Sequence, residues 1–212
     1  MSIMNALVTP DRVLVGVDTE ADSERQSDKV PKRYEISKLF PLVHANVVMA
    51  ARGSHAFHMP VLFHLSVSEA ATYDAMVTDL SGALVRMVDQ AHAAIRCAGA
   101  SPSFDIGTQE IYLFGWSDQS SRMMGTAFTR DPNSGQWEVL SIDDGVDSGW
   151  VAPWGEDWGE YREPQDLEEM QALAHSQVRI TRERAPEVAI GGRLIVAELT
   201  RESVSIKSTC AL

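Results

Sequence analysis

The order of apolar patterns along the chain limits the folds that it can adopt. Strand-like and helical segments occur in separate runs rather than in strict alternation. The expected strands cover residues 4–9, 13–17, 34–42, 46–51, 110–116, 124–130, 136–142, 194–199 and 204–207, and the expected helices begin near residues 54, 70 and 165. Such segregated runs favour an α+β fold over a doubly wound parallel sheet. No repeat or Pro-rich linker divides the 212 residues, so we expect a single domain over residues 1–212.

Charge and cysteine content indicate which partners and compartment suit this chain. Its net charge of −12 would repel nucleic acids and anionic membranes. Cys97 and Cys210 are too few for a disulfide framework, which favours a reducing compartment. No apolar run approaches the roughly 20 residues of a membrane helix, and the N-terminus lacks a secretion signal pattern. We therefore expect a cytoplasmic protein with no nucleic-acid or membrane partner.

Three polar residues near the N-terminus suggest a reactive centre. A serine hydroxyl needs a base to become a nucleophile, and removal of Met1 would give Ser2 a free α-amine close to its own Oγ. The reference pKa of such an amine, about 7.7–8.0, leaves a useful fraction neutral. Lys38 would lower that pKa or accept the proton when neutral, and Asp18 would hold and compensate Lys38. A retained Met1 would tie the amine into a peptide bond and remove this base.

Three segments, in this order, resemble proteasome β-type subunits of the N-terminal nucleophile hydrolase superfamily. Residues 6–19 (ALVTPDRVLVGVDT) are similar to the family's opening hairpin, residues 37–40 (SKLF) to its lysine segment, and residues 191–197 (GGRLIVA) to its paired-glycine strand. The resemblance implies a four-layer αββα sandwich, in which two stacked antiparallel sheets are flanked by helices. It also implies symmetric homo-oligomers, ring-like in the family.

The same resemblance implies a catalytic site. The implied catalytic residues are Ser2, Asp18, Lys38, Gly53, Ser148 and Glu187, and the implied substrate-binding residues are Met49 and Ala51. Ser2 would attack an amide carbonyl and form an acyl-enzyme, while the N–H of Gly53 would donate to the oxyanion. The family's Ser-Gly-Ser loop is not reproduced in this sequence, where residues 145–148 (GVDS) occupy that region and Ser148 would be its substitute. Ile190 departs from the family, which has a supporting serine at this position.

Three further clusters have ordinary structural interpretations. Three histidines lack a fourth ligand or a recognised metal spacing, so packed helix histidines are favoured over a metal site. Three aspartates lack the full calcium-loop pattern and suit a solvated turn. Three tryptophans suit packing or a subunit contact better than a ligand cage. These groups are His55, His58 and His64; Asp143, Asp144 and Asp147; and Trp150, Trp154 and Trp158.

The function that we expect is a cytosolic homo-oligomeric peptidase or amidohydrolase. It would cleave peptide or small amide substrates and need no cofactor or metal. The alternative is a non-catalytic structural or assembly subunit, which Ile190 and a retained Met1 would favour. A third possibility is a shared scaffold that binds a small molecule or protein, because fold does not determine function.

Overall fold

The computed structural model describes residues 2–22, 33–97, 99, 106–142, 149–150 and 164–212. Its strands are β1 Met4–Val8, β2 Arg12–Asp18, β3 Glu20–Asp22, β4 Arg33–Glu35, β5 Leu39–Leu42, β6 Val47–Arg52, β7 Gln109–Ser117, β8 Arg122–Arg130, β9 Trp137–Ser141, β10 Gly149–Trp150, β11 Arg193–Thr200 and β12 Val204–Ala211. Its helices are α1 His55–Val67, α2 Tyr73–Cys97 and α3 Leu167–Arg184, and a short 3-10 turn covers Val43–Ala45.

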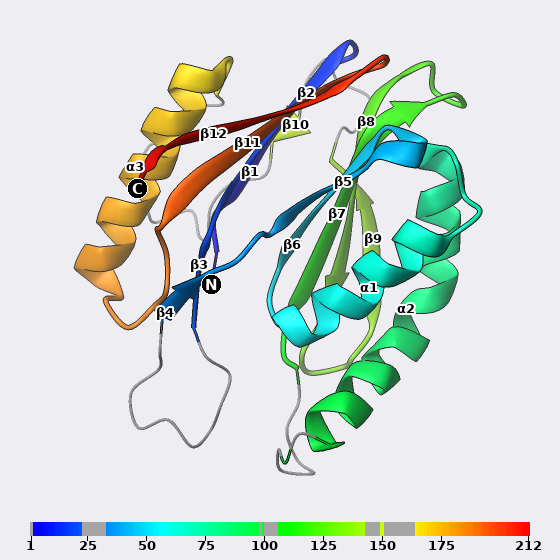
Figure 1. Ribbon diagram of the computed structural model, residues 1–212, viewed down its shortest axis with the longest axis horizontal. Coiled ribbons are helices and arrows are strands. Elements are labelled where there is room, and N and C mark those ends of the chain that lie inside the picture. Colours follow the sequence, from blue (N-terminus) through cyan, green and yellow to red (C-terminus); the bar gives the residue numbers. More distant parts are fainter. Residues whose placement is uncertain (1, 23–32, 98, 100–105, 143–148, 151–163) are drawn as a thin grey trace.

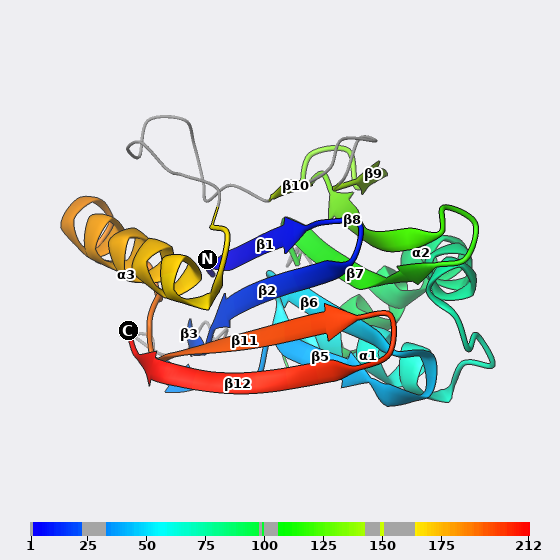
Figure 2. The same cartoon turned by 90° about the horizontal axis from the view of Figure 1, so that it is seen from above.

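Two five-stranded antiparallel sheets form the centre of the molecule (Figure 1). The first sheet has the order β10-β1-β2-β11-β12, and the second has the order β5-β6-β7-β8-β9. Figure 2 shows β1, β2, β11 and β12 side by side in the first sheet, although β2 and β11 lie far apart in the sequence. The pairing of β11 with β2 places Leu194 opposite Asp18. It thereby brings the late glycine pair, Gly191 and Gly192, close to the N-terminal hairpin formed by β1 and β2.

Alternating apolar residues give the strands of the first sheet two buried faces. In β2, Val13, Val15 and Val17 pack in a cluster that also contains Val48 of the second sheet. Leu14 points to the other face, where it packs with residues of α3. Successive side chains of a strand point to opposite faces, so this one strand contributes to two cores. The hydrophobic contact between the sheets holds the N-terminal hairpin against the second sheet.

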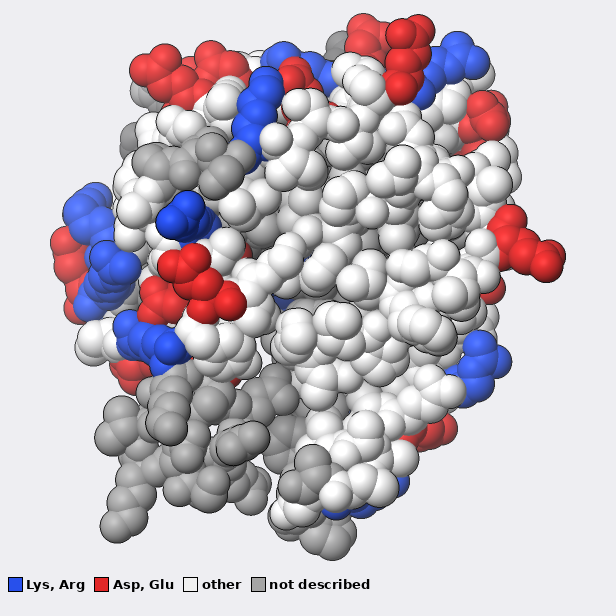
Figure 3. Space-filling view, in the orientation of Figure 1, with Lys and Arg blue, Asp and Glu red and all other residues white. Residues whose placement is uncertain are grey.

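Helices α1 and α2 pack on the outer face of the second sheet (Figure 1). The helical period expected from residue 70 onward forms α2, whose buried face includes Met76, Leu80 and Met87. These side chains share a cluster with Phe57 of α1 and Phe128 of β8. On the side shown in Figure 3, the surface over α1 is largely uncharged. No helix among the described residues is both long and apolar enough to cross a membrane.

Helix α3 covers the outer face of the first sheet. Asp166 caps its N-terminus by accepting a hydrogen bond from the N–H of Glu169 at 2.9 Å. The carboxylate of Glu169 in turn accepts from the N–H of Gln165 at 2.7 Å. Met170 then approaches the strand β2 closely, since a side chain at Gly16 would meet it at 3.2 Å. The helix therefore begins at a defined residue and packs over a glycine of the sheet.

The expected four-layer αββα sandwich is wrong for this chain. The described strands form three sheets rather than two, because β3 and β4 form a separate hairpin. The N–H groups of Thr19 and Glu20 donate to the carbonyl of Gly191, which leads the chain out of the first sheet after β2. The flanking helices are also unequal in the described chain, two beside the second sheet and one beside the first (Figure 1). Because β4 belongs to this separate hairpin, the single strand expected over residues 34–42 is divided into β4 and β5, which lie in different sheets.

Candidate functional site

A buried ion pair joins the end of β2 to the start of β5. The ammonium of Lys38 lies 2.9 Å from Oδ1 of Asp18 and also donates to the backbone carbonyl of Glu20. Asp18 is fully buried and Lys38 is 4% exposed. Lys38 immediately precedes β5, and Asp18 is the last residue of β2. The spacing seen in the sequence therefore corresponds to a direct contact between the two side chains.

Asp18 also holds the N-terminus and the late glycine pair. Its Oδ1 accepts a hydrogen bond from the N–H of Ile3 at 2.9 Å, and its Oδ2 accepts from the N–H of Gly191 at 3.1 Å. One oxygen atom thus binds both Lys38 and the peptide that links Ser2 to Ile3. A buried carboxylate needs hydrogen-bond donors, and here the backbone N–H groups of Ile3 and Gly191 supply them. Asp18 therefore fixes the position of the backbone next to Ser2.

Burial and charge act in opposite directions on the ion pair. Burial lowers the pKa of Lys38, and the adjacent negative charge of Asp18 partly offsets this effect. Burial likewise raises the pKa of Asp18, which Lys38 and the N–H groups of Gly191 and Ile3 partly offset. The ammonium therefore loses its proton more readily than an exposed lysine would.

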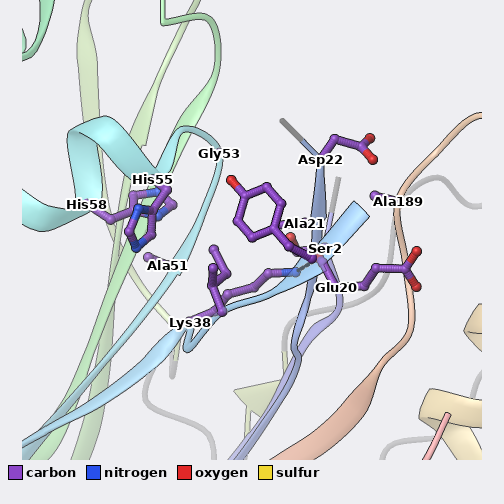
Figure 4. A pocket seen from close by; sticks show the side chains of 12 residues that line it. Ser2, Glu20, Ala21, Asp22, Lys38, Ala51, Gly53, His55, His58 and Ala189 are labelled. Atoms are coloured by element: carbon purple, nitrogen blue, oxygen red, sulfur yellow. Dashed lines mark hydrogen bonds between the residues drawn. The ribbon is translucent and has the colours of Figure 1, made fainter. Parts of the chain in front are cut away.

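A cavity of about 190 Å³ lies directly beside this pair (Figure 4). Its lining includes Ser2, Lys38, Ala51, Gly53, His55 and His58. Figure 4 shows the Lys38 side chain reaching toward Ser2, with the histidines on the opposite side. Ser2 is 9% exposed, so its surroundings are mostly protein. Four of the residues named from the sequence, Ser2, Lys38, Ala51 and Gly53, therefore line the same cavity.

Gly53 occupies a backbone conformation that a side chain would disturb. Its φ is +116°, and an added Cβ would lie 2.7 Å from both the carbonyl oxygen of Thr108 and Oε1 of Gln109. The same Oε1 accepts from the N–H of Ser54 at 2.9 Å, at the start of α1. This glycine thus permits the tight change from β6 to α1 beside the cavity.

The structure does not bring all the expected site residues to the cavity. Met49 is fully buried in the core between the second sheet and the helices, and it is not among the cavity-lining residues. Glu187 is exposed in the turn that follows α3, and Ala189 lines the cavity in its place. Ser148 lies outside the described residues.

Ile190 has a structural role that accounts for its departure from the expected serine. Its side chain is 2% exposed and packs with Met170 and Val178 of α3. The following glycines have positive φ, and a Cβ on Gly192 would lie 2.5 Å from Oγ1 of Thr19. The chain therefore anchors α3 at this point and then crosses closely over the end of β2.

The sequence did not identify the histidines of α1 as part of the site. His58 is 2% exposed, and its Nε2 atom is buried without a hydrogen-bond partner. Burial lowers the pKa of His58 to about 3. The signal available in the sequence was the His55–His58 spacing directly after Gly53, which places both at the start of a helix. Within the described part of the chain, no group of three or more His, Cys, Asp and Glu residues is arranged to hold a metal ion.

The acidic and tryptophan clusters are described only in part. Asp143, Asp144 and Asp147, together with Trp154 and Trp158, lie outside the described residues. The backbone of Trp150 belongs to β10, where it pairs with Leu7 of β1.

The fold is similar to that of solved proteasome-like proteins. In sequence, the chain matches no protein-family model and no curated protein. Among solved structures, the helical assembly of the Anbu complex from Pseudomonas aeruginosa matches with a TM-score of 0.61 at 13% identity, over 97% of this chain and 86% of that chain. Anbu (ancestral beta-subunit) from Yersinia bercovieri gives 0.56 at 13% identity, over 97% and 87%. Anbu from Hyphomicrobium sp. strain MC1 gives 0.53 at 15% identity, over the same shares.

These matches correct the family inferred from the sequence. The assignment to proteasome β-type subunits is wrong, because the similar structures are Anbu proteins, which are proteasome-like but form a family of their own. The three segments that carried the resemblance coincide with the buried ion pair and the glycine crossing. At these identities the likeness extends to the fold alone.

Proposed function

We propose that this chain is an amide hydrolase whose nucleophile is the hydroxyl of Ser2. Ser2 becomes the first residue, with a free α-amine, when Met1 is removed. The main support is the Asp18 carboxylate, whose Oδ1 binds both the Lys38 ammonium and the N–H of Ile3 at 2.9 Å. This arrangement holds a cationic side chain next to the residue that carries the nucleophile. The adjoining cavity of about 190 Å³ provides space for the substrate group.

The reaction divides amide cleavage into two steps. Ser2 Oγ forms a bond to the amide carbonyl carbon, and its proton passes to the free α-amine of Ser2. The C–N bond then breaks, the α-amine protonates the leaving amine, and an ester to Ser2 remains. Water, deprotonated by the same amine, cleaves the ester and restores the hydroxyl.

Three groups assist these steps in the proposed site. Lys38 stabilises negative charge on Ser2 Oγ, and its lowered pKa also allows it to take part in proton transfer. Asp18 is a positioning residue, since it binds Lys38 and the backbone beside Ser2. The backbone N–H of Gly53, at the edge of the cavity, donates to the developing oxyanion. Ala51 contributes an apolar part of the substrate pocket.

A hydrolysis assay with matched serine variants tests this function. Protein that begins at Ser2 should hydrolyse a panel of fluorogenic peptide amides, and Ser2→Ala should abolish turnover. Ser81, exposed on α2, provides the control, so Ser81→Ala should retain full activity. Equal turnover by the Ser2→Ala variant would exclude Ser2 as the nucleophile.

A second proposed function is self-association, with or without catalysis. Met59, Phe63 and Val67 recur every fourth residue along α1 and are 42%, 70% and 62% exposed. Val85 of α2 is 69% exposed, and the surface over α1 is largely uncharged (Figure 3). The net charge of −12 opposes the approach of two copies, and this repulsion is smallest where the facing surfaces carry little charge. The solved Anbu helical assembly supports a second copy of this chain as the occupant.

A further inference from the structure

A second hollow lies on the other side of the extended segment that precedes and begins β5. Its volume is about 470 Å³. Successive residues of an extended chain point to opposite sides, and the two linings follow this alternation. Tyr34 and Lys38 line the Ser2 cavity, whereas Glu35, Ser37 and Leu39 line the second hollow. The segment thus forms a wall between the two spaces, and we call the second one the edge groove.

The edge groove lies where the two five-stranded sheets end. β5 is the outer strand of the second sheet, and β12 is the outer strand of the first. Leu39 and Pro41 of β5 line one side, and Ile195 of β11 and Ile206 of β12 line the other. Ile206 is 44% exposed and Pro41 is also exposed, so part of this apolar surface is open to a ligand. The volume falls within the roughly 300–1,000 Å³ of typical small-molecule pockets.

Two side chains of opposite charge, Glu35 and Arg193, belong to the same lining. They are 58% and 64% exposed, so a ligand in the groove can reach both. Nε of Arg193 lies 3.9 Å from Oε2 of Glu35, which is too long for a hydrogen bond. The carboxylate and the guanidinium therefore keep hydrogen-bonding capacity that they do not use on each other.

The other polar side chains of the lining already bond within the protein. Thr19 Oγ1 accepts from the N–H of Arg193 at 2.8 Å and donates to Oε2 of Glu35 at 3.4 Å. Ser37 Oγ donates to the carbonyl of Leu39 at 2.8 Å. The groups best able to bind a ligand are thus one carboxylate and one guanidinium, both beside an apolar surface.

We propose that the edge groove binds a free apolar α-amino acid. The ammonium of the ligand binds Glu35, its carboxylate binds Arg193, and its side chain packs against Ile195 and Ile206. A ligand with a carboxylate alone would face the like charge of Glu35, and a ligand with an amine alone would face that of Arg193. A zwitterion satisfies both groups at once. Binding at this groove does not depend on the chemistry proposed for Ser2.

NMR titrations of the isotope-labelled full chain test the proposal. The probes are L-leucine, isocaproate, which lacks the amine, isopentylamine, which lacks the carboxylate, and glycine, which lacks the apolar side chain. L-Leucine should bind at least about tenfold more tightly than each of the other three, and the N–H signals that shift should be those of the edge groove. Equal binding by any of the three, or no saturable shift of those signals with L-leucine, overturns the proposal.

Variants that remove one charge assign each end of the ligand to one side chain. Arg193→Gln should weaken L-leucine binding about tenfold without weakening isopentylamine, and Glu35→Gln should weaken L-leucine by a similar factor without weakening isocaproate. Both side chains are largely exposed, so the variants should fold. Arg179→Gln is the matched control, because Arg179 is also 64% exposed but lies on α3. It should bind L-leucine as the wild type does. Unchanged L-leucine affinity in Arg193→Gln or in Glu35→Gln overturns the proposal.

Discussion

Oδ1 of Asp18 accepts hydrogen bonds from Lys38 Nζ and from the N–H of Ile3, each at 2.9 Å. A single buried oxygen atom therefore connects the charged side chain to the backbone next to the proposed nucleophile. The structural and catalytic consequences of this contact can be measured separately.

Removal of the lysine charge should be costly for folding. Lys38→Met leaves the Asp18 carboxylate buried without its cation, which should lower the free energy of unfolding by about 3–5 kcal/mol. Urea denaturation followed by tryptophan fluorescence measures this change. The double variant Asp18→Asn with Lys38→Met should recover part of the stability, because no uncompensated charge remains.

The single variant Lys38→Met and the double variant Asp18→Asn with Lys38→Met should differ in stability but not in activity. Both should lack amide hydrolysis, since the proposed mechanism needs the ammonium beside Ser2. Full activity in the folded double variant would show that Lys38 has only a structural role.

The close approach of Gly192 to Thr19 at the end of β2 should not tolerate an added methyl group. Gly192 has φ +75°, and its Cβ would lie 2.5 Å from Oγ1 of Thr19, so Gly192→Ala should lower stability by more than about 1 kcal/mol. Gly82 is the matched control, because a Cβ there meets nothing within 4 Å on the surface of α2. Gly82→Ala should raise stability by about 0.5–1 kcal/mol. Thermal unfolding of both variants compares them, and equal effects would contradict the close crossing.

The stability of the protein should depend on pH through His58. Its pKa is about 3 in the folded chain and about 6.5 when exposed. Between these values the unfolded chain binds a proton that the folded chain does not, so stability falls as the pH falls below 6.5. By linkage, this histidine should lower the free energy of unfolding by about 2 kcal/mol between pH 7 and pH 5. Denaturation curves of the wild type and His58→Leu at both pH values test this, and identical pH dependence would contradict a buried neutral ring.

Self-association should depend on the exposed stripe of α1. Phe63 is 70% exposed, so Phe63→Glu should leave the fold intact and reduce the association state measured by analytical ultracentrifugation. Val139 of β9, 47% exposed at the edge of the second sheet, provides the control. Val139→Glu should associate as the wild type does. Loss of association in the control alone would assign the interface to the sheet edge instead.

The sequence located the ion pair but not the whole site. The spacing of Asp18 and Lys38 could be used because both residues adjoin strong apolar strand patterns. The neighbours Val17 and Leu39 pack in the core between the two sheets, and this packing brings the ion pair together. His58 could not be identified as a cavity residue, because helical periodicity gives its face but not the buried atom without a partner. The two residues expected to bind substrate, Met49 and Ala51, share one face of β6, and only the packing of α1 shows that Met49 is enclosed in the core.

The hairpin β3–β4 is the main feature of the fold that local pattern could not predict. Its strands have three residues each, and their position depends on hydrogen bonds to Gly191, which is distant in the sequence. The turn after α3 has a similar explanation. It exposes Glu187 and turns Ile190 into the core beneath the helix, and counting from the glycine pair alone could not show that Ala189, rather than Glu187, lines the cavity.

The most direct test is the intact mass of the protein after reaction with a serine-reactive β-lactone. The chain is prepared in two forms, one released from a cleavable fusion so that it begins at Ser2, and one that retains Met1. The proposed mechanism predicts a single adduct on the first form, its loss in Ser2→Ala, and no adduct on the second form. An adduct of equal yield on both forms, or one that persists in Ser2→Ala, would contradict an N-terminal nucleophile.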